Sequence, residues 1–291
     1  MITNLFDINT IRIIETIPEG HGRIGKNLYV DFPVALLPGG ESFKPTYKLA
    51  NNKKELFDYL DKIADEINKF KVMPIIHIEA HGNEEGIGVG EEDFVKWFEL
   101  VEKFKKINLT MCNNLLVVMS ACKGINLQKI FVEAAKSSAS LDISPIFALI
   151  GSPNEITMKN ARDDFLRFYN KLLETNNNTG HKNLNEAFEA LIKDGTDYKF
   201  ISCLDIFIRN YIEVLKKIYS DKYKDTFIEH AFEHAFNKSR DKFLMIDICS
   251  NNSSRFSLSF SEIREIEKEF QRMEKETVET RPFKTLNFRI V

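Results

Sequence analysis

Short apolar runs alternate with amphipathic stretches along this 291-residue chain, and this alternation constrains its fold more than any other feature. Three runs, residues 72–80, 115–120 and 146–150, are rich in Ile, Leu and Val, which is typical of strands buried on both faces. Apolar residues recur at helical spacing in the stretches after them, at residues 91–106, 125–139, 158–175 and 184–193. The order strand, helix, strand, helix, strand predicts an α/β domain with a mostly parallel sheet sandwiched by helices.

The two ends of the chain are less regular. Residues 11–17 and 27–32 are β-like runs, and residues 52–70 carry the apolar spacing of a helix. Past residue 196 the pattern becomes mostly helical. We therefore predict an α/β domain over residues 1–196, and a mainly helical extension, residues 197–291, that packs on this core.

Composition and charge exclude several classes of protein. Apolar residues make up 43% and charged residues 29%, and a net charge of -3 gives no electrostatic reason to bind nucleic acid. No apolar stretch approaches the roughly 18 residues of a membrane span, and the first residues lack the pattern of a signal peptide. The four cysteines form no CxxC pair, so neither a structural zinc site nor a disulfide framework is indicated. We predict a cytoplasmic protein with free thiols, no cofactor, and neither nucleic acid nor membrane as a partner.

One histidine and one cysteine stand directly after predicted strands. His81 follows residues 72–80, and Cys122 follows residues 115–120. If these strands are parallel neighbours, both side chains emerge at the carboxyl edge of the sheet, where open α/β sheets bind their ligands. An imidazole beside a thiol favours the thiolate, which is the nucleophilic form of cysteine. The sequence therefore predicts a Cys122–His81 pair for nucleophilic catalysis.

The residues around this pair suit the same chemistry. Cys122 leads through Lys123 and Gly124 into a predicted helix, whose positive end would favour a thiolate. Gly82 and Gly124 have no side chain, so a substrate backbone can approach the sulfur. The backbone N–H groups of Gly82 and Cys122 are candidates for an oxyanion hole.

The motifs resemble those of a known family. One apolar strand is followed by His81-Gly82, and the next ends in Ser120-Ala121-Cys122-Lys123-Gly124. These segments resemble the His-Gly and Ser-Ala-Cys-x-Gly motifs of CHAT and caspase-like cysteine peptidases. The resemblance extends over residues 52–193. Caspases proper prefer Gln at the position of Ser120, so the CHAT branch matches better. The resemblance implies a caspase-like sheet, His81 as general base, Cys122 as nucleophile, and oxyanion donors at positions 82 and 122.

These observations predict a cysteine endopeptidase, a thiol protease that hydrolyses a protein substrate. Relatives of this type serve as regulated proteases in bacterial antiviral defence or cell death, so the resemblance also implies an activating protein partner. Acidic residues near the expected cleft favour a basic residue before the cleaved bond, and they are Glu79, Glu84, Glu85 and Asp93. The alternative is a caspase-like binding or scaffold module in which the Cys–His pair is silent.

Two further patterns allow other interpretations. His77, Glu79 and His81 would share one face of a strand and could hold a metal, but the spacing lacks the His-Glu order of a zincin, so no metal site is predicted. The segment between a predicted strand and a predicted helix contains Gly86, Gly88 and Gly90, a spacing similar to that of a dinucleotide-binding loop. Three acidic residues follow them and would repel a pyrophosphate, so we predict a short hairpin there.

Overall fold

The computed structural model describes residues 8–33, 35–36, 42–111, 114–137, 146–156, 158–174 and 184–203, with the single residues 206, 213, 216 and 268. The chain divides into two compact units, and the described residues up to 206 belong to the first. The predicted helical extension thus lies almost wholly outside the described residues. Of the helices that these residues form, none is long and apolar enough to cross a membrane.

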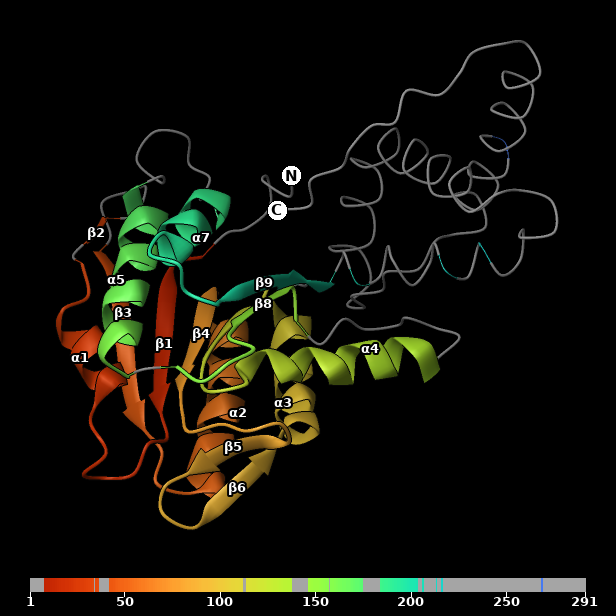
Figure 1. Ribbon diagram of the computed structural model, residues 1–291, viewed down its shortest axis with the longest axis horizontal. Helices are drawn as coiled ribbons and strands as arrows, with labels where there is room; N and C mark the ends of the chain where they lie inside the picture. The colour runs from red at the N-terminus through yellow and green to blue at the C-terminus, as the bar shows by residue number, and fades with distance from the viewer. Residues whose placement is uncertain are drawn as a thin grey trace. The chain divides into compact units, whose positions relative to one another are not determined.

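A seven-stranded sheet forms the centre of the described unit (Figure 1), in the order β2-β3-β1-β4-β7-β8-β9. The five inner strands β3, β1, β4, β7 and β8 run parallel, and the edge strands β2 and β9 are antiparallel to their neighbours. The bounds are β1 Thr10–Glu15, β2 Ala35–Leu36, β3 Ser42–Leu49, β4 Pro74–Glu79, β7 Leu116–Ser120, β8 Ala148–Gly151 and β9 Lys199–Ser202. The predicted α/β class with a mostly parallel sheet is confirmed.

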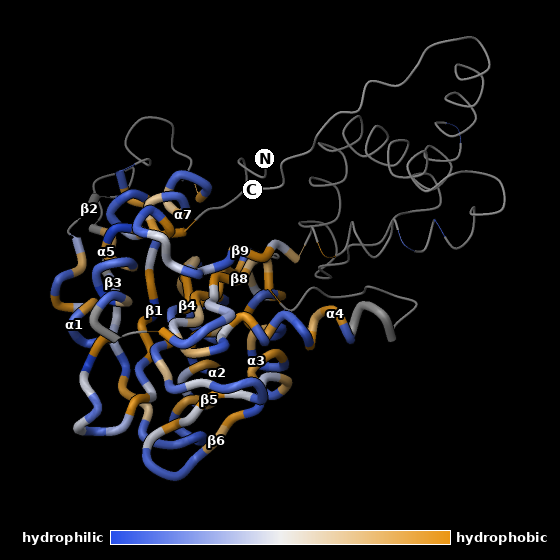
Figure 2. Tube along the Cα trace, in the orientation of Figure 1, coloured by the Kyte–Doolittle hydropathy of each residue, from blue (hydrophilic) through white to orange (hydrophobic). Residues whose placement is uncertain are grey.

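Helices cover both faces of this sheet (Figure 1). One face carries α1 (Ile24–Val30), α5 (Met158–Glu174) and α7 (Leu184–Ile192), and the other carries α2 (Lys53–Phe70), α3 (Trp97–Thr110) and α4 (Leu127–Ser137). Each face has its own cluster of buried apolar side chains. Figure 2 shows the apolar residues concentrated in the strands, whereas the helices also carry polar residues. The hydrophobic effect therefore stabilises a three-layer arrangement.

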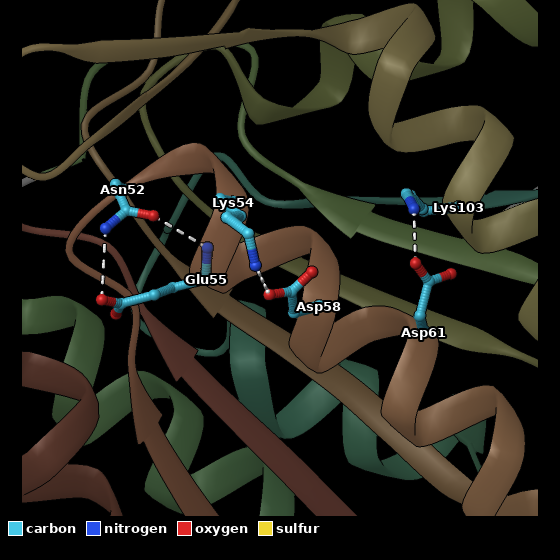
Figure 3. A network of polar contacts seen from close by, with 6 residues as sticks. All are labelled: Asn52, Lys54, Glu55, Asp58, Asp61 and Lys103. Carbon is cyan, nitrogen blue, oxygen red and sulfur yellow. Dashed lines mark hydrogen bonds and ion pairs between the residues drawn. The ribbon is translucent and has the colours of Figure 1, made fainter.

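Helix α2 illustrates how local sequence sets an element's bounds. Asn52 caps the helix by accepting a hydrogen bond from the Glu55 N–H at 2.9 Å, and its own amide donates to the Glu55 carboxylate at 3.2 Å (Figure 3). Lys103 on α3 donates to Asp61 at 2.7 Å and joins the two helices on the surface. The predicted helix over residues 52–70 therefore matches α2.

Two predicted elements are wrong. Residues 27–32 were expected to be β-like, but Leu28 belongs to α1. An alternating strand would give Leu28 and Val30 the same environment, whereas Leu28 is fully buried and Val30 is 68% exposed. Ile24 and Leu28, one helical turn apart, form the buried side instead.

The second error concerns residues 91–106, which were predicted to be one helix. Residues up to 96 instead form a hairpin of β5 (Gly86–Val89) with β6 (Asp93–Lys96), and α3 begins only at Trp97. The helix starts there because the Glu99 carboxylate accepts from the Lys96 N–H at 3.1 Å and caps it. The hairpin prediction for the glycine-rich segment is confirmed.

Candidate functional site

The candidate site lies at the carboxyl ends of three neighbouring strands, β1, β4 and β7. Strands β4 and β7 are parallel, with Glu79 opposite Ser120, and the Ala80 N–H donates to the Ser120 carbonyl at 3.2 Å. His81 and Cys122 each stand two residues beyond this register pair. The structure thus brings both to the same edge of the sheet, as the sequence predicted.

The backbones of Gly82 and Cys122 lie in contact. A Cβ atom on Gly82 would stand only 2.4 Å from the carbonyl oxygen of Cys122 and 3.1 Å from the Cβ of Ala121. Only glycine therefore fits at position 82. Within the described part of the chain, neither the Gly82 N–H nor the Cys122 N–H donates a hydrogen bond. Two adjacent backbone donors are thus available at this point.

The turn after Cys122 holds the cysteine in place. Lys123 has a positive φ of 58°, and its N–H donates to the Asn154 carbonyl at 3.2 Å. The first helical turn is a 3-10 turn, η1 (Gly124–Asn126), packed so closely that a Cβ on Gly124 would be 2.8 Å from the Met119 carbonyl oxygen. Cys122 therefore precedes the helical segment by two residues. Its sulfur, half-buried, accepts a hydrogen bond from the Ile156 N–H at 3.4 Å.

His81 has an unexpected neighbour. Its Nε2 atom lies 3.2 Å from Nδ1 of His21, which belongs to the loop after β1, and the two rings are inclined at 65°. Partial burial lowers the pKa of His81 below its ordinary value, and the charge that His21 can carry lowers it further. Among the described residues, no hydrogen bond joins His81 to Cys122. Such contacts often tighten only when substrate binds.

A row of polar side chains is buried one layer beneath these strand ends. Glu15, Glu79 and Ser120 stand opposite one another on β1, β4 and β7. Each is less than a twentieth exposed. Burial raises the pKa of Glu15, whose carboxylate accepts from the Tyr47 hydroxyl at 2.6 Å and from the Gly25 N–H at 3.2 Å. A polar row in an otherwise apolar sheet is expensive unless it is hydrogen-bonded or has a function.

His77 lies below this row and supports Glu79. Its Nε2 atom is 2.8 Å from a Glu79 carboxylate oxygen, and its Nδ1 atom is 2.7 Å from the Tyr169 hydroxyl. Both ring nitrogens are therefore occupied within the protein. The described residues contain no cluster of three or more His, Cys, Asp or Glu side chains that could hold a metal ion.

Two buried hydroxyl groups, those of Ser120 and Tyr198, lie at the other end of the row. Neither makes a hydrogen bond of ordinary geometry among the described residues. Burial raises the pKa of Tyr198 and the negative charges of Glu79 and Asp164 raise it further, whereas the neighbouring Ser120 hydroxyl lowers it. The site therefore contains two buried polar groups beside several carboxylates.

The structure does not gather the four acidic residues predicted to bind substrate. Glu79 lies in the buried row, whereas Glu84 and Glu85 are exposed at the start of the hairpin. Asp93 accepts a hydrogen bond from the Lys53 N–H at 2.7 Å, at the N-terminus of α2. Only Glu79 is therefore placed beneath the His81 and Cys122 positions.

Sequence reasoning missed His21 and Glu15. The sequence offered a signal for both, because Glu15 lies near the end of the predicted β-like run over residues 11–17 and His21 stands between two glycines just beyond it. The rule that selected His81 and Cys122, a polar residue at the carboxyl end of a parallel strand, applies equally to them.

No protein-family model and no curated protein matches this chain. The fold and the site define an α/β protein with a histidine and a cysteine at the ends of adjacent parallel strands.

Proposed function

We propose that this protein is a caspase-like cysteine endopeptidase of the CHAT type, with Cys122 as nucleophile and His81 as base. The observation that carries the proposal is the backbone contact between Gly82 and Cys122. It brings the two strand ends together and leaves two backbone N–H donors unused among the described residues. The mostly parallel sheet between two helical layers agrees with the fold that the resemblance implies.

In the proposed mechanism, His81 takes the proton of the Cys122 thiol, and the sulfur attacks the carbonyl carbon of the scissile peptide bond. The negative charge that develops on the carbonyl oxygen is stabilised by the N–H groups of Gly82 and Cys122. As the carbon–nitrogen bond breaks, His81 returns the proton to the leaving amine. Water then hydrolyses the thioester to release the second product and the free thiol.

The resting geometry supports a regulated enzyme. The Cys122 sulfur accepts from the Ile156 N–H, and no hydrogen bond joins it to His81 among the described residues, so the nucleophile is engaged elsewhere. Activation then requires a small rearrangement that pairs Cys122 with His81, induced by substrate or by a protein partner. The resemblance to regulated proteases of bacterial defence and cell death is consistent with this requirement.

We further propose that the substrate carries a basic residue before the cleaved bond. The carboxylates of Glu79 and Asp164 both act on the buried Tyr198 hydroxyl, as Cys122 does, so they lie close to the Cys122 strand end. An ammonium or guanidinium group would be stabilised by these charges, whereas an acidic side chain would be repelled.

A peptide-library cleavage assay on the full chain, compared with Cys122→Ala, tests the activity. We expect cleavage after Lys or Arg in the wild type and none in Cys122→Ala, while His81→Ala loses about 10²- to 10⁴-fold in rate. Cleavage that survives Cys122→Ala would refute the proposal. Cleavage after Asp or Glu would refute only the predicted specificity.

The alternative function is a scaffold with a silent site, and the missing His81–Cys122 hydrogen bond is the observation that favours it. Iodoacetamide labelling separates the two, because thiolate reactivity depends on the base. A peptidase site predicts that His81→Ala slows the labelling of Cys122. An unchanged rate, together with no cleavage of any peptide, would favour the scaffold.

A further inference from the structure

The loop that joins β1 to α1 is held firmly against the candidate site. Its first residue, Thr16, donates its N–H to the Glu79 carbonyl at 2.9 Å and its hydroxyl to the Gly88 carbonyl at 2.8 Å. At the other end, the Arg23 guanidinium donates to the Ile17 carbonyl at 3.0 Å. These contacts fix the loop to the end of β4 and to the hairpin, so the position of His21 is built into the fold.

The backbone on either side of His21 requires glycine. Gly20 and Gly22 have φ values of 97° and 99°, which other residues rarely adopt. The His21 N–H donates to the Pro18 carbonyl at 3.3 Å and closes a tight turn. This turn lets a single imidazole reach back over the sheet edge toward His81.

The contact between the two imidazoles has a definite chemical consequence. Nδ1 of His21 and Nε2 of His81 are 3.2 Å apart, a distance at which one nitrogen donates and the other accepts. Whichever way the proton lies, Nε2 of His81 is occupied. Nδ1 is therefore the ring nitrogen left to take a proton from the thiol, and it can do so only when the hydrogen of neutral His81 sits on Nε2.

We propose that His21 is a positioning residue of the site. It accepts a hydrogen bond from Nε2–H of His81, selects that tautomer, and so presents Nδ1 of His81 as the basic nitrogen. This inference rests on the proposed peptidase function for its significance, but the hydrogen bond itself does not. Because His21 acts through His81, it does not itself touch the reacting atoms.

The backbone of His81 is fixed separately from its ring. The Gly88 N–H donates to the His81 carbonyl at 2.8 Å, which holds the main chain. A Cβ on Gly88 would stand 3.9 Å from that of His81, so the hairpin leaves the side chain room to turn. His21 is the only side chain with a hydrogen bond to the His81 ring among the described residues.

Nitrogen-15 NMR of the full chain, labelled at its six histidines, tests this directly, because ring nitrogen shifts report the tautomer. The His81 signals are assigned by their loss in His81→Gln. We expect the Nε2–H tautomer for His81 in the wild type at neutral pH, and a mixture of tautomers in His21→Ala. His21→Asn, whose amide oxygen stands near the place of Nδ1, retains the wild-type tautomer. Glu19→Gln, an exposed change in the same loop, alters nothing.

Cleavage assays on the same variants give the second readout. We expect kcat to fall about 10- to 100-fold in His21→Ala, as for other residues that orient a functional histidine, with KM unchanged and with partial recovery in His21→Asn. A wild-type His81 that carries its hydrogen on Nδ1, or a tautomer that is unaffected by His21→Ala, would overturn the proposal. If no variant cleaves any peptide but the tautomer follows His21, the peptidase function fails while the positioning role stands.

Discussion

The two faces of the central sheet are built from the same strands but differ in chemistry. Most inner-strand side chains that point toward α2, α3 and α4 are apolar and fully buried, among them Ile14, Ile76, Ile78, Val117, Met119 and Leu149. Arg12 of β1 also points this way and pairs with Glu66 of α2 at 3.0 Å. Toward α1, α5 and α7, the same strands carry Glu15, His77, Glu79 and Ser120 at or near their carboxyl ends. Because successive side chains of a strand alternate between faces, one sequence serves both.

This difference separates stability from function. The face toward α2, α3 and α4 stabilises the fold mainly by apolar burial, and its Arg12–Glu66 ion pair lies before the carboxyl end of β1. On the polar face, the buried row lies directly beneath Cys122 and His81. A substitution in this row is therefore expected to alter the positions of these two residues.

The largest effect is expected on the apolar face. Phe104 on α3 is fully buried, and Phe104→Ala should lower the free energy of unfolding by about 3–5 kcal/mol through lost burial and the cavity left behind. Phe98→Ala on the same helix, where the residue is 53% exposed, should cost far less. Urea denaturation measures both. The folded Phe104→Ala protein should keep the Cys122 labelling rate, and a large change would break the proposed separation.

Gly82 should be the most sensitive glycine for activity. A Cβ there meets the Cys122 carbonyl oxygen at 2.4 Å, so Gly82→Ala should displace an oxyanion donor and reduce cleavage about 10²- to 10³-fold. Gly88→Ala is the matched control, because its Cβ would make only ordinary contacts, at 3.9 Å. Steady-state kinetics of both variants decide the matter. Equal losses would show that the close approach at Gly82 has no special role.

The buried polar face should depend on single hydroxyl groups. Tyr169→Phe removes the partner of His77 Nδ1 and should lower the free energy of unfolding by about 1–3 kcal/mol, the cost of an unsatisfied buried polar group. Tyr59→Phe on the opposite face removes only a half-buried contact with Thr46 and should cost less. Denaturant unfolding of the two variants makes the comparison, and a smaller loss in Tyr169→Phe would contradict it.

The smallest effects concern pH, and they should have opposite signs at two carboxylates. Burial raises the pKa of Glu15, so its contribution to stability is present below its ordinary pKa of 4.5 and is lost as the pH rises above that value. The Lys103 ammonium lowers the pKa of Asp61, so the contribution of Asp61 is present above 3.8 and is lost as the pH falls.

Unfolding free energies measured against pH for Glu15→Gln and Asp61→Asn test these signs. The free energy of unfolding of Glu15→Gln, taken relative to that of the wild type, should increase as the pH rises from 4.5 toward neutrality. The relative free energy of unfolding of Asp61→Asn should increase as the pH falls below 3.8. A common sign for both would refute the assigned environments.

Much of the inner sheet could be predicted because its signals are local and strong. The runs over residues 72–80, 115–120 and 146–150 are mostly apolar and buried on both faces, as is typical of inner parallel strands. Strands β3 and β9 escaped detection because they are less apolar, with Lys and Pro in β3 and a four-residue length in β9. Their identity depends on pairing with β1 and β8, which lie far away in sequence.

The sequence by itself determined the α/β class and the placement of His81 and Cys122 at strand ends, because side-chain periodicity and apolar runs are properties of neighbouring residues. Only the tertiary structure decided that Gly82 touches Cys122, that Glu15, Glu79 and Ser120 form one buried row, and that His21 faces His81. Each of these contacts joins residues at least 40 positions apart in the sequence. Strand order and register fix them, and no local pattern encodes either.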